Sequence, residues 1–292
     1  MYQNSDVYMS FIFFAALCSV AVSIVLKKFK QRDYAVLQMI VWNYVTASIL
    51  CWLWFKPDFT HLSLHATPWW LIGLLGMLLP TIFFCLAKSL QHAGIIKTEV
   101  AQRLSVVLSL LAAYFIFHEQ FSSLKLWGVV LGVVAVLSLI AAKTQAMPQA
   151  QSSKAGLFLA SVWVGYALID ILLKYNSSLG QQFALSLNLM FILAGITSAV
   201  FVSLSKQQWQ PKNFPAGMLL GVLNFANIAL YVQAHQLLKD APAVVFVVMN
   251  VSVVTLGVLS GLLYFKEKPN LMTVVGLLLS LIGVACLAMS MA

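Results

Sequence analysis

The sequence predicts an all-α integral membrane protein whose ten transmembrane helices form two inverted five-helix repeats. Three observations predict this fold class: the composition, the length of the apolar segments and a motif that recurs in the second half. Of the 292 residues, 62% are hydrophobic and 9% are charged, whereas soluble domains have about 45–50% and about 25%. A chain this apolar cannot bury its surface in water, so we expect most of it to lie in lipid.

The apolar segments have the length of membrane-spanning helices, because a hydrocarbon core of about 30 Å requires about 20 apolar residues. Ten such segments follow one another, near residues 7–26, 34–55, 69–88, 96–117, 124–142, 155–174, 182–204, 215–234, 241–265 and 270–291. The longest connection is the polar segment KTQAMPQAQSSK. We therefore predict a first repeat over 1–142, a linker over 143–154 and a second repeat over 155–292.

A charged motif recurs at the end of the fourth and ninth segments. FHE at 117–119 aligns with FKE at 265–267 at an offset of 148, and a glycine follows each glutamate by nine residues. Slightly upstream, RLSVV at 103–107 aligns with NVSVV at 250–254. Because each half has an odd number of helices, the second half must enter the membrane from the opposite side. The repeats are therefore inverted, as is typical of secondary transporters, whose substrate site lies between the halves.

These features resemble the drug/metabolite transporter superfamily, most closely its EamA-type branch. The resemblance covers essentially the whole chain, and its best pieces are AQRLSVVLSLLAAYFIFHE at 101–119 and VVTLGVLSGLLYFKEK at 253–268. It implies a ten-helix carrier, usually an exporter of amino acids, drugs or amine-containing metabolites. Members often carry an arginine within the second helix, where this chain has Trp42, Asn43 and Tyr44. No role of that arginine can be carried over.

Polar residues at the start of the fourth segment suggest two interpretations. Ionisable groups inside a spanning helix cost about 2.5–3.5 kcal/mol each, so they tend to face the bundle interior and to pair. Glu99 and Arg103 are spaced i, i+4, which permits a structural ion pair. In the second interpretation Arg103 lines a substrate pathway, together with its neighbours and with the residues of the second half that the repeat aligns with them. That pathway would be lined by Gln102, Arg103, Ser105, Asn250 and Ser252.

The sixth segment carries Trp163, Tyr166 and Asp170 on one helical face, spaced i, i+3, i+7. Aromatic faces beside a carboxylate suit an organic cation or a zwitterion with an amine. The alternative is an interfacial aromatic belt, because Asp170 lies only four residues before Lys174 near the helix end. Both interpretations stay open at the level of the sequence.

The eighth segment repeats that spacing with Asn224, Asn227 and Tyr231. Three polar groups on one face favour the lining of a cavity, although amides also form hydrogen bonds between helices. Asn43 and Asn188 are isolated within the second helix of each half, which favours such interhelical bonds.

Several other function classes are disfavoured. No GxxxxGK[ST] motif is present, so ATP hydrolysis by this chain is not expected. The five histidines are scattered and the four cysteines form no CxxC pair, so we expect no metal, no cofactor and no enzyme activity. HEQFS, at His118 and Glu119, lacks the second histidine of a metalloprotease motif. Glu119 and Glu267 are instead expected to cap loops or to brace the turn into the next helix.

We therefore expect a secondary-active or facilitative transporter that exports a small polar or amphipathic metabolite by alternating access. Its partners would be that substrate and the lipid bilayer, together with protons if transport is coupled, with Glu99 and Asp170 as candidates for coupling. One alternative is a lipid or lipid-phosphate flippase of the same architecture, because Arg103 and Lys97 could attract a phosphate. The other is a membrane-embedded enzyme acting on lipid-linked substrates, which the scattered histidines disfavour. The basic residues lie in short loops rather than in one stripe, so we expect no nucleic-acid partner.

The loop charges predict the orientation in the cell inner membrane. Twelve lysine and arginine residues fall in the odd-numbered loops, whereas the even-numbered loops hold four. Short basic loops tend to stay in the cytoplasm. The sequence therefore predicts that both termini lie outside.

Overall fold

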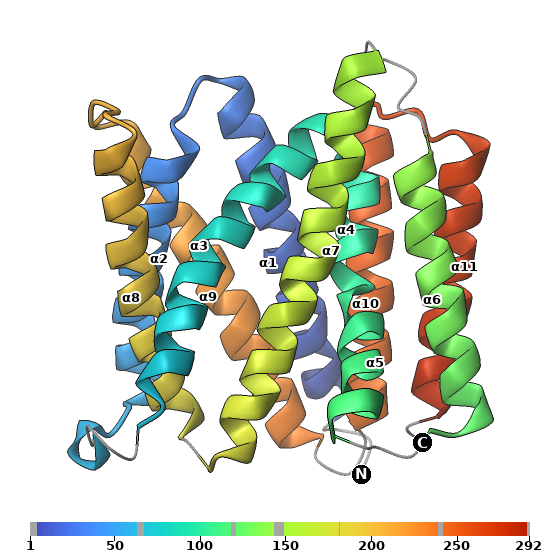
Figure 1. Cartoon of the computed structure of the whole chain (residues 1–292), viewed down its shortest axis with the longest axis horizontal. Coiled ribbons are helices and arrows are strands. Elements are labelled where there is room, and N and C mark those ends of the chain that lie inside the picture. The colour runs from blue at the N-terminus through green and yellow to red at the C-terminus, as the bar shows by residue number, and fades with distance from the viewer. Residues whose placement is uncertain are drawn as a thin grey trace.

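The computed structural model is a bundle of long helices packed side by side (Figure 1). It describes residues 5–62, 67–117, 121–142, 149–180, 182–238 and 242–290, and no strand occurs among them. Both ends of the chain lie at one face of the bundle, which we call the terminal face. The opposite face, at the top of Figure 1, is called the far face.

The helices match the predicted apolar segments. In the first half they are α1 (Ser5–Gln31), α2 (Val36–Phe55), α3 (Trp69–His92), α4 (Ile95–Arg103), α5 (Ser105–Phe117) and α6 (Ser123–Ala141). In the second half they are α7 (Gln149–Ser178), α8 (Phe183–Leu204), α9 (Asn213–Leu237), α10 (Pro242–Leu259) and α11 (Leu271–Met289). A 3₁₀ turn, η2 (Phe59–His61), follows α2, and a π-helical turn, η3 (Ser260–Tyr264), extends α10.

Ten crossings result, as predicted. Within the described residues, nine helices are long and apolar enough to span a membrane one by one. The remaining crossing is the predicted segment 96–117, which is divided at Leu104 into α4 and α5. α7 begins at Gln149, within the predicted linker 143–154. The first residues of this linker, 143–148, lie outside the described part of the chain.

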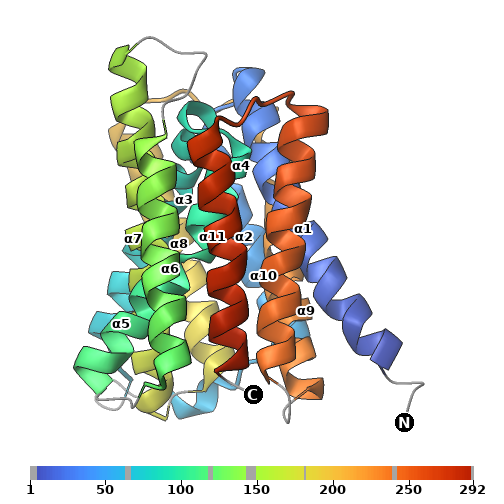
Figure 2. The ribbon, with the colours of Figure 1, turned by 90° about the vertical axis from the view of Figure 1, so that its right-hand side faces the viewer.

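The contacts between the two halves follow a two-fold exchange. α2 packs against α8, α4 against α10 and α6 against α11, and each of these pairs joins equivalent helices. The other large contacts between the halves come in pairs, in which each helix of one contact is replaced by its equivalent in the other repeat. These pairs are α2–α9 with α3–α8, α1–α9 with α3–α7, and α1–α10 with the contacts of α4 and α5 to α7. Figure 2 shows α6 and α11 side by side at the edge of the bundle. This pattern is what inverted repeats require.

Two GxxxG motifs allow close approaches between helices. A Cβ at Gly128 of α6 would meet the Leu287 side chain of α11 at 2.8 Å, and one at Gly132 would meet the Val107 side chain of α5 more closely still. Gly217 and Gly221 of α9 face α2, where a Cβ at Gly217 would lie 2.6 Å from the Met39 carbonyl oxygen. Because lipid offers no hydrophobic drive between helices, small residues stabilise such pairs through close van der Waals packing.

Amide side chains also join the halves. Asn188 of α8 donates a hydrogen bond of 2.8 Å to the carbonyl oxygen of Ser48 in α2, which confirms the interhelical role predicted for it. Asn43 accepts from Asn224 at 3.4 Å. These bonds lie on the α2 side of the bundle, so they fix this part of the interface between the repeats.

The repeat is also visible in the first helix of each half. SIVLK at 23–27 of α1 aligns with DILLK at 170–174 of α7 at an offset of 147, the same offset that relates RLSVV to NVSVV. Lys27 therefore corresponds to Lys174, and Ser23 corresponds to Asp170. Lys27 lies near the end of α1 and Lys174 lies near the end of α7. These two helix ends lie at opposite faces of the bundle, as the inversion requires (Figure 1).

A candidate substrate cavity between the repeats

The fourth crossing is interrupted where its polar residues cluster. The Leu104 carbonyl oxygen accepts hydrogen bonds from the Val107 amide at 3.1 Å and from the Trp163 indole nitrogen at 2.9 Å. Trp163 is only 9% exposed. Its ring therefore lies against the break in the helix rather than among the residues that line the cavity described next.

A cavity of about 210 Å³ lies between the two halves. Its polar groups come from Tyr44, Gln102, Tyr166, Asp170, Asn224 and Asn227. Its apolar lining includes Phe83 and Leu79 of the first half and Met190 and Phe191 of the second half. The structure thus brings together four of the polar groups predicted from the sixth and eighth segments with Gln102 of the fourth.

Asp170 is the acidic residue of this lining. Its side chain is exposed to the cavity, and its Oδ2 atom accepts from the hydroxyls of Ser105 and Ser109, each at 3.4 Å. Hydrogen bonds of this length are weak. The two bonds therefore orient the carboxylate but leave it accessible to a ligand.

Arg103 points toward α1 instead of pairing with Glu99. Its guanidinium donates to the Ser19 hydroxyl, and its Nε atom has no partner. Glu99 is 1% exposed, and neither of its oxygens accepts a hydrogen bond. Among the described residues, the ion pair within 4.0 Å is Lys27–Glu267. The pair that the i, i+4 spacing permits is therefore not formed here.

A small polar chamber adjoins the cavity on the α1 side. Its volume is about 30 Å³, enough for one water molecule. Its polar lining consists of Ser19, Ser23, Gln102, Tyr166, Asn224 and Asn227. The Oδ1 atom of Asn227 is buried without a hydrogen-bond partner. The chamber thus lies between the cavity and the face of α1 on which Ser19 accepts the hydrogen bond from Arg103.

Three predicted residues of the second half, Asn250, Ser252 and Tyr231, do not line the cavity. Asn250 is 6% exposed and donates to the Phe246 carbonyl oxygen of its own helix at 2.7 Å. Tyr231 packs edge-on against the His235 ring, with centroids 4.6 Å apart. The structure therefore groups Gln102 of α4 with Tyr166 and Asp170 of α7 and Asn224 and Asn227 of α9. It leaves outside this group Arg103, Trp163, Tyr231 and the predicted residues of α10.

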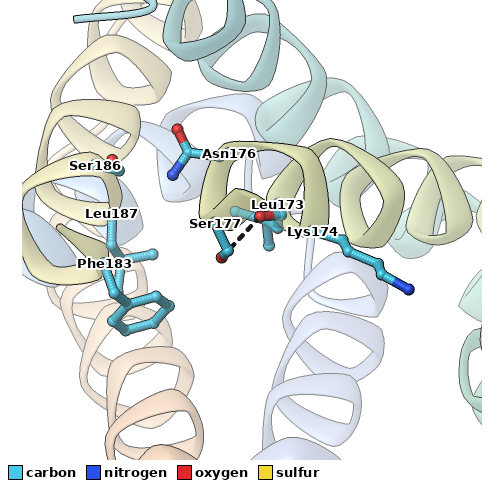
Figure 3. Close-up of a pocket in the computed structure, with 7 residues that line it drawn as sticks. All are labelled: Leu173, Lys174, Asn176, Ser177, Phe183, Ser186 and Leu187. Atoms are coloured by element: carbon cyan, nitrogen blue, oxygen red, sulfur yellow. Dashed lines mark hydrogen bonds between the residues drawn. The ribbon is translucent and has the colours of Figure 1, made fainter. Parts of the chain in front are cut away.

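The cavity continues toward the terminal face. A second hollow of about 140 Å³ lies between the end of α7 and the start of α8 (Figure 3). It shares Leu173 and Leu187 with the central cavity. Further out it is lined by Asn176, Ser177 and Phe183. We call this hollow the vestibule, and through it the cavity approaches the terminal face.

Sequence reasoning missed Ser19, Ser23 and Ser109, because isolated serines in apolar helices carry little signal. The repeat could have found two of them. At the offset of 147, Ser19 aligns with Tyr166 and Ser23 aligns with Asp170, two residues that sequence patterns had singled out. No group of three or more metal-ligating side chains occurs in the described part of the chain. His118 and Glu119 lie outside it.

One protein family matches this chain over most of its length. The EamA-like transporter family matches the chain twice, over residues 7–141 and 153–289. A protein of Haemophilus influenzae described as uncharacterized is 38% identical over 283 residues, which cover 94% of this chain and 96% of that protein. A solved crystal structure superposes with a TM-score of 0.59 at 15% identity and covers 96% of both chains. At that identity the likeness concerns the fold alone.

Proposed function

Because this chain belongs to the EamA-like transporter family, and is thus a multi-pass membrane transporter of small molecules, we propose that it is a secondary carrier that works by alternating access. One observation carries the proposal: the cavity between the repeats combines apolar walls with an accessible carboxylate. Secondary carriers with inverted repeats bind their substrate at this place.

The lining favours an amine-bearing metabolite or drug as substrate. Asp170 supplies a negative charge within the cavity, and Tyr166 and Phe83 supply aromatic surface. Cations bind favourably beside carboxylates and aromatic faces. The amides of Asn224 and Asn227 offer both donors and acceptors, so a zwitterionic amino acid is also accommodated. We propose export as the direction, as the family resemblance implies.

Proton coupling belongs to the same proposal. Glu99 is buried without a partner, and a charge in that position is costly in a spanning helix. Asp170 faces the cavity, so a cationic substrate that binds there would compete with a proton for the same carboxylate. Either carboxylate could carry a proton, whereas facilitated diffusion needs neither. Proteoliposomes with a trapped pH indicator distinguish the two, because a coupled carrier acidifies or alkalinises the lumen when substrate is added.

A phosphate-binding flippase fits the structure less well. Lys97 is 8% exposed and donates to the Ala142 carbonyl oxygen, so its ammonium group does not face the cavity. Arg103 donates to Ser19. The cavity lining contains one carboxylate and no lysine or arginine. A lipid phosphate would therefore meet negative charge rather than positive charge.

A thermal-shift screen of the purified protein tests the substrate class. We expect amines and amino acids to raise the melting temperature, while phosphorylated metabolites of similar size leave it unchanged. Stabilisation by phosphorylated metabolites or lipid phosphates alone would favour the flippase. A reporter fused after Ala292 tests the proposed orientation: one that works only outside the cytoplasm should be active.

A further inference from the structure

One face of α1 runs from the candidate site to the far face. Ser19, Ser23 and Lys27 are spaced by four residues, so they share one side of the helix. Ser19 accepts a hydrogen bond from Arg103. Ser23 lines the polar chamber. Lys27, one turn further, forms an ion pair with Glu267. This side of α1 therefore runs from the polar chamber to an ion pair that lies outside the candidate site.

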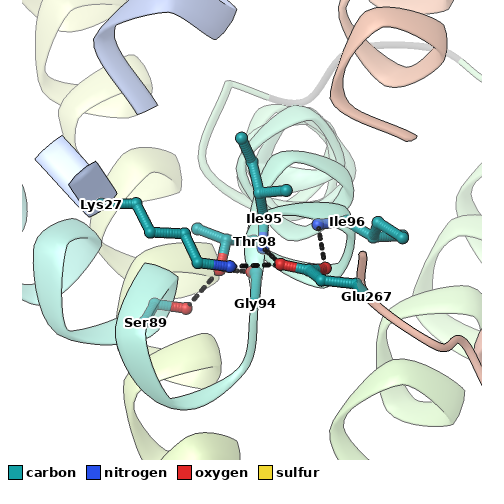
Figure 4. Close-up of polar contacts among 7 residues, drawn as sticks. All are labelled: Lys27, Ser89, Gly94, Ile95, Ile96, Thr98 and Glu267. Atoms are coloured by element: carbon teal, nitrogen blue, oxygen red, sulfur yellow. Dashed lines mark hydrogen bonds and ion pairs between the residues drawn. The ribbon is translucent and has the colours of Figure 1, made fainter. Parts of the chain in front are cut away.

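Glu267 binds three groups from two other elements, α1 and α4 (Figure 4). Besides Lys27, it accepts from the backbone amides of Ile95 at 2.7 Å and Ile96 at 3.3 Å. These amides belong to the first turn of α4, whose free N–H groups and dipole attract a carboxylate. Glu267 lies in the connection between η3 and α11. A residue of the second repeat thus caps a helix of the first, rather than its own following helix.

The surroundings are shaped for this contact. Gly94 has φ of +90°, and a Cβ there would lie 2.7 Å from a Glu267 oxygen. The Lys27 ammonium also lies 4.3 Å from the centroid of the Phe265 ring. We call Lys27, Glu267 and the first turn of α4 the latch. Its side chains are only partly buried, at 10% exposure for Lys27 and 19% for Glu267.

The latch lies beyond the chamber, toward the far face. A hollow of about 160 Å³ at the far-face ends of α1 and α3 shares no lining residue with the chamber or the cavity. Large apolar side chains are buried on the latch side of the chamber. They are Leu26, Leu86, Leu90, Ile95 and Ile96, each at most 2% exposed. In the opposite direction the cavity continues into the vestibule. Lys174, the counterpart of Lys27, lines that vestibule. The structure is thus closed at the far face while the cavity approaches the terminal face.

We propose that the latch is the far-face gate of the carrier and that the transport cycle requires Glu267 to leave Lys27 and the first turn of α4. This inference rests on the proposed alternating-access function. The latch joins α1 and α4 of one repeat to the η3–α11 connection of the other, so the repeats cannot separate at this face while it is formed. The π-helical turn before it supplies a place where the backbone can rearrange.

Hydrogen–deuterium exchange of the full chain in lipid nanodiscs tests the gate without a known substrate. Glu267→Gln keeps the side-chain shape and removes the charge. We expect exchange at 90–98 and 260–270 to rise about fivefold, the factor that loss of a helix cap implies. We also expect exchange at 173–180, beside the vestibule, to fall, because opening one face must close the other. That reciprocal change separates a gate from a contact that only stabilises the fold.

Lys28→Gln is the matched control, since Lys28 lies over the Tyr264 ring and outside the latch. It should change neither region. If Glu267→Gln does not fold, Lys27→Gln is measured in the same way. Increased exchange at 90–98 with no decrease at 173–180 would overturn the gate, as would an equal response to Lys28→Gln. Either outcome would leave the proposed function intact, because the ligand screen tests it separately.

Discussion

The fourth and ninth crossings occupy equivalent places in the two repeats, yet they differ at their centres. The fourth is broken at Leu104, between Arg103 and Ser105, whereas α10 continues through the aligned residues and changes to a π-helical turn only at Ser260. The broken crossing contributes Gln102 to the cavity, while Asn250 of the continuous one bonds to its own backbone. Among the described residues of these two equivalent crossings, only those of the fourth supply a polar side chain to the cavity lining.

Trp163 accounts for part of this difference. It donates to the Leu104 carbonyl oxygen and so satisfies an acceptor where the regular helical bonding is interrupted. At the offset of 147, the position in α1 that corresponds to Trp163 is Ala16, which has no side-chain donor. The ninth crossing therefore receives no such bond from α1. The break in one repeat is thus stabilised by a donor that the other repeat lacks at the equivalent position.

The largest effect is expected from Arg103→Gln, which replaces the guanidinium of the broken crossing with a neutral amide. The Arg103 guanidinium orients Ser19 at the wall of the polar chamber, and loss of a charged hydrogen bond weakens an interaction by about 10- to 100-fold. We expect the disturbed chamber to lower substrate uptake into proteoliposomes by about that factor. The protein should still elute as a monodisperse peak. The double variant Glu99→Gln with Arg103→Gln should remain inactive, because the two side chains are not paired. Restored uptake in the double variant would show that Arg103 serves only as a partner of Glu99.

A somewhat smaller effect is expected from Asp170→Asn. Binding of an amine should weaken by about tenfold, because a charge-assisted contact becomes a neutral one. Binding of a neutral analogue of the same shape should change little, as measured by isothermal titration calorimetry. Asp33→Asn, in the exposed turn after α1, is the matched control. Equal losses for both ligands would assign Asp170 a structural role.

A moderate effect on stability is expected from Trp163→Phe, which keeps an aromatic ring and removes the indole N–H. The lost hydrogen bond corresponds to about 1 kcal/mol, or a decrease of about 2–4 °C in melting temperature. Trp54→Phe, at a side chain that is 59% exposed, should leave the melting temperature unchanged. If both variants behave alike, the bond to Leu104 does not stabilise the break.

The smallest effect is expected from Asn250→Ala in the continuous crossing. Its amide bonds only to the backbone of its own helix, and such a bond contributes little to stability. Uptake should stay within about twofold of the unchanged protein, since less than about 0.5 kcal/mol is involved. A loss as large as that of Arg103→Gln would mean that the two crossings contribute equally to transport.

The sequence by itself determined that the chain lies in a bilayer, that it crosses ten times and that its halves are inverted. These conclusions depend on hydropathy and on an internal repeat, both of which are local or periodic properties of the chain. The same patterns placed Tyr166, Asp170, Asn224 and Asn227 on helical faces, and these faces meet in one cavity. Helical spacing specifies which residues share a face, so this much could be predicted.

Only the tertiary structure decided which polar groups meet. Spacing allowed Glu99 and Arg103 to pair, but Ser19 on another helix accepts the guanidinium instead. Trp163, Tyr166 and Asp170 share a face, yet the break at Leu104 takes Trp163 out of the cavity lining. Glu267 was expected to brace its own turn, and it caps α4 in the other repeat. Each outcome depends on a contact between distant segments, which helix periodicity does not encode.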